Sequence, residues 1–344
     1  MDAGILGYGL YLPYYRIKTA EIAPVWGKLA SDIERSLGIS QKSVAAMDED
    51  AVTMAYQASL DALLDAGINP GKIEALMVGS ESHPYAVNPT STILGEFLGI
   101  GHSYLATDLE FACKAGTTAL ISLAAMISSG TFSTAMAVGS DCAQAKPHDI
   151  LEYTAASGAA AFILGTKHKA IADIVAITSY SSDTPDFWRR DGVRFPSHGG
   201  RFTGEPAYFS HVENCGRQLF EKSKLTARDF RFAVFHMPNG KFPKEAAKRL
   251  GFTEEQTAAS LIVKDIGNPY TASSLIGLAA ALDQAQQNDL IFLVSYGSGA
   301  GSDGLVLRMT KNAGKKRNGA NYQERQYRKK YISYLDYLKF RGKI

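Results

Sequence analysis

Short apolar runs alternate with longer amphipathic stretches along this chain, an order that is typical of α/β proteins. The runs at 74–81, 135–143, 231–236 and 290–298 are rich in Val, Ile, Leu, Phe and Ala, and they end in small or polar residues. Such runs predict strands that are covered on both faces of a sheet. The stretches 51–67 and 206–223 predict helices, and each leads through a turn into one of these strands.

The apolar pattern repeats at a constant offset. Residues 119–126 (ALISLAAM) match 274–281 (SLIGLAAA), and the same offset aligns the run at 135–143 with the run at 290–298. An internal repeat of this length can decide the architecture by itself. We therefore expect two similar α/β halves, residues 1–166 and 167–344.

Four polar residues correspond through this repeat. Glu81 aligns with His236, each at the end of a predicted strand, and Cys113 aligns with Asn268, each before an apolar helix. A duplicated fold with a pseudo-twofold axis brings equivalent strand ends and helix starts together. We therefore expect all four side chains in one pocket.

This set suits carbon–carbon bond formation from a thioester, which needs a nucleophile, a base and a polarising group. The start of a helix favours the thiolate of Cys113, and burial raises the pKa of Glu81. Backbone N–H groups of the glycine-rich segment 295–304 suit an oxyanion hole. Each residue also has a structural interpretation: a packed cysteine, a loop carboxylate, a core histidine at His236 and a helix cap at Asn268.

Composition narrows the function further. The 344 residues include 36 Lys and Arg against 34 Asp and Glu, and no apolar run approaches the roughly 20 residues of a membrane-spanning helix. Three cysteines without CxxC spacing and seven histidines without HExxH predict no metal site. The glycine motifs match neither dinucleotide nor phosphate-binding loops. We expect a cytoplasmic protein without a bound nucleotide cofactor.

The C-terminal segment 311–344 is strongly basic, with 11 Lys and Arg against Glu324 and Asp336. Tyr327, Tyr331 and Tyr334 follow a helical spacing, so we expect a solvated terminal helix whose tyrosines dock on the body. A basic stripe that contacts nucleic acid, an acidic partner or a phosphate-bearing ligand is the alternative.

Several motifs together resemble the archaeal branch of the 3-hydroxy-3-methylglutaryl-CoA (HMG-CoA) synthases. They are SESHPYAVNPTST (80–92), DLEFACKAGTTAL (108–120), HMPNGKFP (236–243), GNPYTASS (267–274) and SYGSGAGSDG (295–304). The resemblance implies a thiolase-like α/β fold, with two duplicated halves in five α-β-α-β-α layers. It also implies that acetyl-CoA, acetoacetyl-CoA and water give HMG-CoA and CoA, in the mevalonate route to isoprenoids.

The resemblance also implies roles for single residues. Cys113 would carry the acetyl group, Glu81 would deprotonate it, and His236 would polarise the ketone, with the backbone N–H groups of Cys113 and Ser298 as the oxyanion hole. Residues matching substrate and CoA contacts are Lys28, Thr154, Arg201, Thr203, Lys241, Lys244, Asn268 and Ser298. Coenzyme A thioesters are then substrates, and neither cofactor, metal, nucleic acid nor membrane is implied. The family implies a homodimer, and a complex with an acetoacetyl-CoA thiolase and a small OB-fold protein.

Two alternatives remain open from the sequence. A ketoacyl synthase III-like enzyme would use Cys113, His236 and Asn268 with a malonyl carrier, but it needs no base at Glu81. A non-catalytic scaffold that binds acyl-CoA is the second alternative. A degradative thiolase would place a second cysteine in the segment 295–304, which has none.

Overall fold

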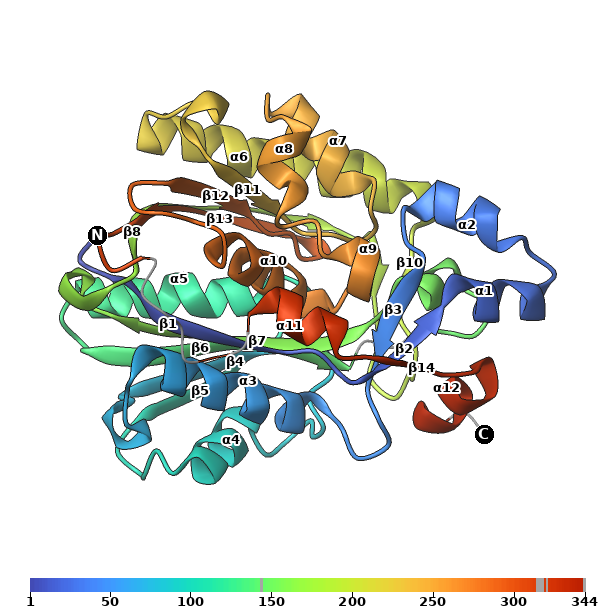
Figure 1. The fold of residues 1–344 in the computed structure, drawn as a ribbon, viewed down its shortest axis with the longest axis horizontal. Coiled ribbons are helices and arrows are strands. Elements are labelled where there is room, and N and C mark those ends of the chain that lie inside the picture. Colours follow the sequence, from blue (N-terminus) through green and yellow to red (C-terminus); the bar gives the residue numbers. More distant parts are fainter. Residues whose placement is uncertain (143–144, 314–318, 320, 343–344) are drawn as a thin grey trace.

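The computed structural model describes residues 1–142, 145–313, 319 and 321–342. Nine strands form one hydrogen-bonded sheet in the order β11-β12-β13-β8-β1-β7-β6-β4-β5. The first part of the sheet comprises β1 (Gly4–Tyr11), β4 (Ala75–Gly79), β5 (Leu105–Leu109), β6 (Thr134–Cys142) and β7 (Ser157–Gly165). The second part comprises β8 (Ala172–Thr184), β11 (Phe232–Phe235), β12 (Leu290–Val294) and β13 (Gly299–Met309). Figure 1 shows the two parts as stacked layers, which join where β1 pairs with β8.

Both parts of the sheet have the same topology. β1 is antiparallel to β7, β7 is antiparallel to β6, and β6 is parallel to β4. In the second part, β8 is antiparallel to β13, β13 is antiparallel to β12, and β12 is parallel to β11. β5 extends the first part by pairing in parallel with β4. The repeat in the sequence is therefore a repeat of strand order.

Helices cover both layers and fill the space between them, which confirms the expected five-layered thiolase-like fold (Figure 1). α5 (Ala115–Ser128) and α10 (Ser273–Leu282) lie between the layers, and every residue of α10 is buried. α3 (Ala51–Ala66) and α4 (Thr90–Leu98) cover the first layer. α6 (Phe209–Ser223), α7 (Phe242–Arg249) and α8 (Glu254–Ala258) cover the second. Small side chains let the two central helices pack closely between two sheets.

The elements depart from the expected bounds in two places. β12 ends at Val294, so the last residues of the predicted strand 290–298 form a loop instead. α6 begins at Phe209, and a separate turn at Gly204–Tyr208 contains Pro206, which has no N–H to donate to a preceding turn.

Several smaller elements lie outside the nine-stranded sheet. β2 (Tyr15–Lys18), α1 (Thr19–Ile22), α2 (Ala30–Leu37) and β3 (Gln41–Val44) follow β1 in the chain, and α9 (Val263–Ile266) precedes α10. β9 (Phe187–Trp188) and β10 (Ser197–His198) form a hairpin. These segments supply several of the residues around the site.

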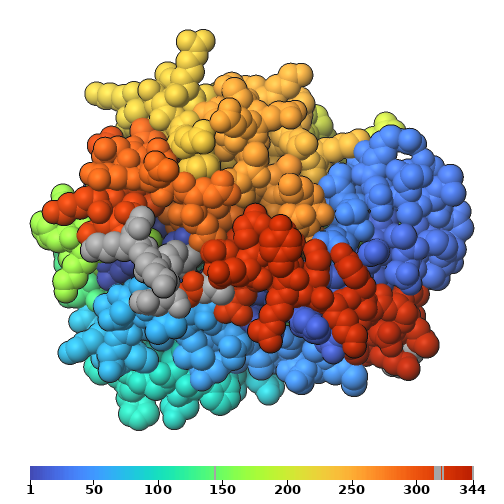
Figure 2. Space-filling model, in the orientation of Figure 1, coloured from blue at the N-terminus to red at the C-terminus, as the bar shows by residue number. Residues whose placement is uncertain are grey.

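The prediction of a terminal helix for the segment 311–344 is wrong. The segment forms α11 (Tyr322–Tyr327), β14 (Lys330–Tyr331) and α12 (Tyr334–Phe340), because Asn321 and Ser333 each cap a new helix start and β14 pairs with β2. Tyr322 and Tyr337 are buried, whereas Tyr327 is exposed. Figure 2 shows this segment, in red, lying across the surface between the two halves.

No helix among the described residues is long and apolar enough to cross a membrane. Within the same residues, no cluster of three or more His, Cys, Asp or Glu side chains has the arrangement of a metal site.

Candidate active site

Cys113 and Glu81 are in direct contact at the junction of β4 and α5. The Cys113 thiol donates a hydrogen bond to Glu81 Oε1 over 2.9 Å. Gly79 makes this contact possible, because a Cβ there would lie 2.5 Å from backbone atoms of Ala115 and Gly116. The end of β4 can therefore pack directly against the first turn of α5.

Asp141, at the end of β6, holds the Glu81 segment in place. Its Oδ1 accepts the backbone N–H of Glu81 at 2.8 Å and the hydroxyls of Ser80 and Ser82 at 2.9 and 2.7 Å. Its Oδ2 accepts the backbone N–H of Thr271, 2.9 Å away in the other half. The sequence analysis missed this residue, although an acidic residue that ends an otherwise apolar strand was a usable signal.

Burial shifts the pKa of both partners of the contact. It raises the pKa of the Glu81 carboxyl group to about 8, and the charge of Asp141 adds to the effect. Burial, followed by the charge of Glu81, raises the pKa of the Cys113 thiol well above its ordinary value. The expected preference for thiolate is therefore wrong for the resting site. The influence of the helix start is outweighed by a desolvated environment that already holds a carboxyl group.

His236 is buried as a neutral imidazole. Its backbone N–H donates to Val294 O over 3.1 Å, which fixes it at the end of β11, and its carbonyl accepts the Tyr208 hydroxyl at 2.7 Å. Burial lowers the pKa of His236 to about 3. Its Nδ1 has no hydrogen-bond partner among the described atoms. A buried nitrogen without a partner is costly unless a ligand meets it.

Tyr296, the second residue of the glycine-rich segment 295–304, packs near His236. Its ring centroid is 6.3 Å from that of His236, and its hydroxyl donates to Asp186 Oδ2 over 2.8 Å. Asp186 Oδ1 accepts the backbone N–H of Gly299 at 2.8 Å. Asp186 is fully buried and anchors the loop that carries Ser298, a role that the sequence analysis missed.

The glycine-rich loop lies beside the nucleophile. A Cβ on Gly297 would lie 2.6 Å from Phe111 O and 3.1 Å from Lys114 N, so only glycine fits there. Ser298 is next in the chain, so the backbone at this position lies close to the Cys113 turn.

Asn268 joins the halves next to the site. Its backbone N–H donates to Thr154 O over 2.7 Å, and its carbonyl accepts from Ala156 N at 2.9 Å. Its side-chain Oδ1 accepts the backbone N–H of Tyr270 at 3.0 Å. In the structure Asn268 thus caps a local turn, the structural alternative considered above, at a position that adjoins Thr154.

Lys114, directly after Cys113, forms a buried ion pair that sequence reasoning did not identify. Its Nζ lies 3.0 and 3.2 Å from the two carboxylate oxygens of Asp303 and 2.9 Å from Thr118 Oγ1. Asp303 also accepts the hydroxyls of Thr118 and Ser179 at 2.7 and 2.8 Å. The sequence of the glycine-rich segment 295–304 does not indicate that Asp303 pairs with Lys114, which is distant in the chain.

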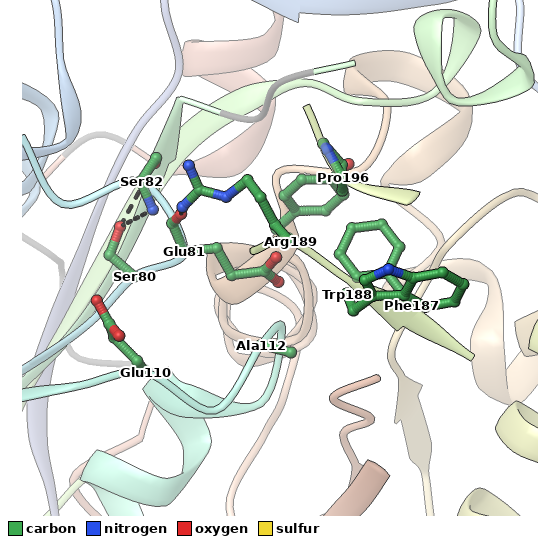
Figure 3. Close-up of a pocket in the computed structure, with 10 residues that line it drawn as sticks. Ser80, Glu81, Ser82, Glu110, Ala112, Phe187, Trp188, Arg189 and Pro196 are labelled. Carbon is green, nitrogen blue, oxygen red and sulfur yellow. Dashed lines mark hydrogen bonds between the residues drawn. The ribbon is translucent and has the colours of Figure 1, made fainter. Parts of the chain in front are cut away.

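Three neighbouring cavities, linked by shared lining residues, begin at Glu81. The first, of 290 Å³, is called the glutamate cavity here, and Figure 3 shows the Glu81 carboxyl group pointing into it. It is lined by Ser80, Glu81, Ser82, Glu110, Ala112, Phe187, Trp188, Arg189, Pro196 and Tyr270. Arg189, another residue absent from the sequence predictions, donates to the Glu81 carbonyl over 3.1 Å.

The second, the threonine cavity, has a volume of 370 Å³ and is lined by Thr154, Arg201 and Thr203 among mostly apolar neighbours. The third, the lysine cavity, has a volume of 710 Å³ and is lined by Lys241, Lys244 and Lys248. Phe187 lines both the glutamate and threonine cavities, and Phe242 lines both the threonine and lysine cavities. The cavities therefore form a row that begins at Glu81 and ends among lysines.

Five predicted residues line none of the three cavities: Cys113, His236, Asn268, Ser298 and Lys28. Lys28 is exposed between the turn at Ala23–Trp26 and α2, and it lines none of the three cavities. Its expected contact with CoA has no support from its position.

Along its whole length the chain is similar to proteins of known function. The chain is 53% identical over 341 residues to a hydroxymethylglutaryl-CoA synthase of Archaeoglobus fulgidus, covering 99% of both chains. It is 48% identical over 346 residues to one of Methanosarcina barkeri, covering 100% of this chain and 99% of the relative. A family model described as the C-terminal part of 3-oxoacyl-[acyl-carrier-protein] synthase III matches residues 220–309.

Solved structures show the same fold at low identity. An MvaS in complex with 3-hydroxy-3-methylglutaryl coenzyme A superposes with a TM-score of 0.91 at 23% identity, covering 99% of this chain and 91% of that one. A 3-oxoacyl-(acyl carrier protein) synthase III, FabH from Pseudomonas aeruginosa, gives 0.82 at 21% identity, covering 90% of this chain and 99% of that one.

Proposed function

The chain belongs to the hydroxymethylglutaryl-CoA synthase family, and on that premise we propose a role for each side chain of its site. The reaction condenses acetyl-CoA with acetoacetyl-CoA and water to give HMG-CoA and CoA, a step of the mevalonate route. The contact of 2.9 Å between the Cys113 thiol and the Glu81 carboxyl group carries this proposal, because it places a nucleophile and a base on one acyl group.

Cys113 first takes the acetyl group. Its sulfur bonds to the carbonyl carbon of acetyl-CoA, the bond from that carbon to the CoA sulfur breaks, and the thiol proton leaves with CoA. The backbone N–H groups of Cys113 and Ser298 are proposed to hold the oxyanion that forms in between. The close fit of Gly297 against Phe111 and Lys114 supports this pairing, because it brings the loop to the nucleophile.

Glu81 then forms the new carbon nucleophile. Its carboxylate removes a proton from the acetyl methyl group, and the resulting enolate attacks the ketone carbon of acetoacetyl-CoA. His236 is proposed to orient and polarise the ketone oxygen as a neutral hydrogen-bonding group, which agrees with its lowered pKa and its unpartnered nitrogen. The proton held by Glu81 passes to that oxygen, and hydrolysis of the Cys113 thioester frees the product.

The row of cavities suits a coenzyme A thioester. We propose that Thr154, Arg201 and Thr203 contact the pantetheine arm in the threonine cavity, and that Lys241 and Lys244 meet CoA phosphates at the lysine cavity. Asn268 and Ser298 are proposed to contact the acyl end. Lys28 is proposed to contact CoA from outside the three cavities. Coenzyme A thioesters are thus the proposed substrates, and no step of the proposed mechanism uses a cofactor.

Mass spectrometry tests the mechanism directly. Incubation with acetyl-CoA is expected to add one acetyl group to Cys113, and later addition of acetoacetyl-CoA should yield HMG-CoA. Cys113→Ser should remain unlabelled, and Cys215→Ser, remote in sequence and buried, should label like the parent protein. Failure of the parent protein to acetylate would refute the enzyme mechanism and leave the acyl-CoA-binding scaffold.

Glu81→Ala separates the two chemical steps. The variant should still acetylate, because removing the carboxyl group removes one cause of the raised Cys113 pKa, but it should not condense. Loss of acetylation would contradict the role given to Glu81. Condensation with a malonyl carrier in place of acetoacetyl-CoA would favour the ketoacyl synthase III-like alternative, whose family model and fold the chain shares.

We also propose the expected assembly: residues 1–166 and 167–344 as the two halves, a cytoplasmic homodimer, and a complex with an acetoacetyl-CoA thiolase and a small OB-fold protein. The exposed and half-buried strand β5, at one end of the described sheet, supports pairing with a second copy. Sedimentation of the purified protein, alone and with those partners, tests the assembly.

A further inference from the structure

Two of the cavities are lined by neighbours of the nucleophile. Cys113 belongs to a small apolar cluster with Tyr270, Phe187 and Leu151. Tyr270 lines the glutamate cavity, Leu151 lines the threonine cavity, and Phe187 lines both. Cys113 lines neither cavity itself, but the cluster around it supplies walls to both, so its acyl group is next to the place where the two cavities meet.

The last chemical step needs water while one of these cavities is filled. After condensation the acyl chain is bonded to Cys113 at one end and to CoA at the other. By the proposed function, the pantetheine arm still occupies the threonine cavity, so water cannot approach along it. Water must reach the Cys113 thioester from another side.

We infer that the glutamate cavity is the water entry route for hydrolysis of the Cys113 thioester, an inference that rests on the proposed function. Its walls carry polar side chains of Glu81, Ser82, Glu110 and Arg189, which can hold water by hydrogen bonds. Figure 3 shows these groups along one side of the cavity, with Phe187, Trp188 and Pro196 along the other.

The step balances with water as the only co-reactant. The water oxygen bonds to the carbonyl carbon of the thioester, and the bond from that carbon to the Cys113 sulfur breaks. One water proton restores the Cys113 thiol, and the other is released when the new carboxyl group ionises. HMG-CoA then leaves with its CoA thioester intact.

The hairpin of β9 and β10 controls the width of this route. Trp188 is 46% exposed at the cavity, and Phe187 lies next to Tyr270 with ring centroids 6.1 Å apart. These aromatic rings form the apolar wall opposite the polar one. A smaller side chain at Trp188 should admit more water, and a larger one at Pro196 should admit less.

Two variants test the inference on the full-length protein. Rapid-quench mass spectrometry of Cys113 would give the acetylation rate and the amounts of the acetyl and HMG-CoA adducts. In a second assay, with acetoacetyl-CoA left out, the release of free CoA thiol would give the rate of acetyl-CoA hydrolysis. Pro196→Trp should slow hydrolysis about threefold or more relative to acetylation, so that the HMG-CoA adduct accumulates on Cys113. Trp188→Ala should raise the hydrolysis of acetyl-CoA severalfold.

Val193→Trp is the matched control, because Val193 is exposed on the same hairpin and does not line the cavity. It should leave the ratio of hydrolysis to acetylation unchanged. Equal slowing of acetylation and hydrolysis in Pro196→Trp would overturn the inference, since the cavity would then hold the acyl group. An unchanged ratio in both cavity variants would overturn it too. Absence of acetylation in the parent protein would instead refute the proposed function.

Discussion

At the scale of single residues, the Glu81 carboxyl group determines how the reaction should depend on pH. Its pKa of about 8 means that the base form is the minority below that pH and grows as the pH rises. The condensation rate of the pre-acetylated protein should therefore increase with pH, by about tenfold per pH unit below the pKa, and level off above it. The acetylated sulfur can no longer donate to Glu81, which removes a cause that lowers this pKa, so the levelling should come above pH 8. Stopped-flow mixing with acetoacetyl-CoA across pH 6 to 9 measures this profile.

Asp141→Asn should move that profile to lower pH, because the charge of Asp141 is the second cause of the raised Glu81 pKa. The variant should also lose about 1–3 kcal/mol of stability, since an amide cannot accept all of the donors that face the carboxylate. Asp108→Asn is the control, because Asp108 accepts the backbone N–H groups of Thr90 and Ser91 at the start of α4. It should lose stability without moving the profile.

The same pKa makes a prediction about folding. The pKa of Glu81 is higher in the folded protein than the ordinary value of 4.5, so its contribution to stability is complete at low pH and is lost as the pH rises through 8. The Glu81→Gln variant has no ionisable group at this position, so its stability should not decrease for this reason as the pH rises. Between pH 6 and pH 9, the decrease in Tm should be smaller for the variant than for the parent protein. Equal decreases would contradict a raised pKa of the buried Glu81 carboxyl group.

At the scale of elements, the ion pair between Lys114 and Asp303 ties the start of α5 to β13. Both side chains are at least 95% buried, so Lys114→Met leaves a buried carboxylate without its cation and should cost about 3–5 kcal/mol. The double variant Lys114→Met/Asp303→Asn removes the charge as well and should recover part of that loss. Urea unfolding of the single and double variants checks this, and a double variant no more stable than the single one would disagree.

The contact between β4 and α5 depends on a glycine. Gly79→Ala should destabilise the protein by about 3 kcal/mol and separate Glu81 from Cys113, because the new Cβ would lie 2.5 Å from the backbone of α5. At Gly67, an added Cβ would have no neighbouring atom within 4 Å, and only the φ of +63° disfavours a side chain. Gly67→Ala should therefore lower the free energy of unfolding by about 1 kcal/mol. Chemical denaturation and the condensation rate distinguish the two, since only the change at Gly79 should also slow condensation.

At the scale of the whole molecule, the C-terminal segment braces the wall of the threonine cavity. Glu152 is fully buried in the turn Ile150–Tyr153, and its carboxylate accepts Trp26 Nε1, the backbone N–H of His148 and the Tyr334 hydroxyl at 3.0, 2.9 and 3.0 Å. The same turn supplies Leu151 to the cavity, and Thr154 follows it. The ends of the chain thus support residues proposed to contact the substrate.

Removing residues 330–344 should therefore raise the KM for acetyl-CoA more than it lowers kcat, and should lower the Tm. The reason is that Glu152 loses its Tyr334 donor and Lys42 loses its bond to the Tyr337 hydroxyl. Steady-state kinetics and thermal unfolding provide the measurements. Tyr327→Ala, at an exposed position of the same segment, should change neither quantity.

The duplicated architecture could be predicted from the sequence alone, and so could the places of Glu81 and His236 just after a strand in each half. Apolar periodicity and strand ends are local properties, and a repeat transfers them from one half to the other without knowledge of packing. The sequence could not reveal Asp186, Arg189 or the partner of Lys114, because each acts through a contact with residues distant in the chain. Asp141 is different, because an acidic residue at the end of an apolar strand was a signal that the sequence did carry. Only the tertiary structure decided the direction of the Cys113 pKa, since burial beside a carboxyl group is a property of the assembled site.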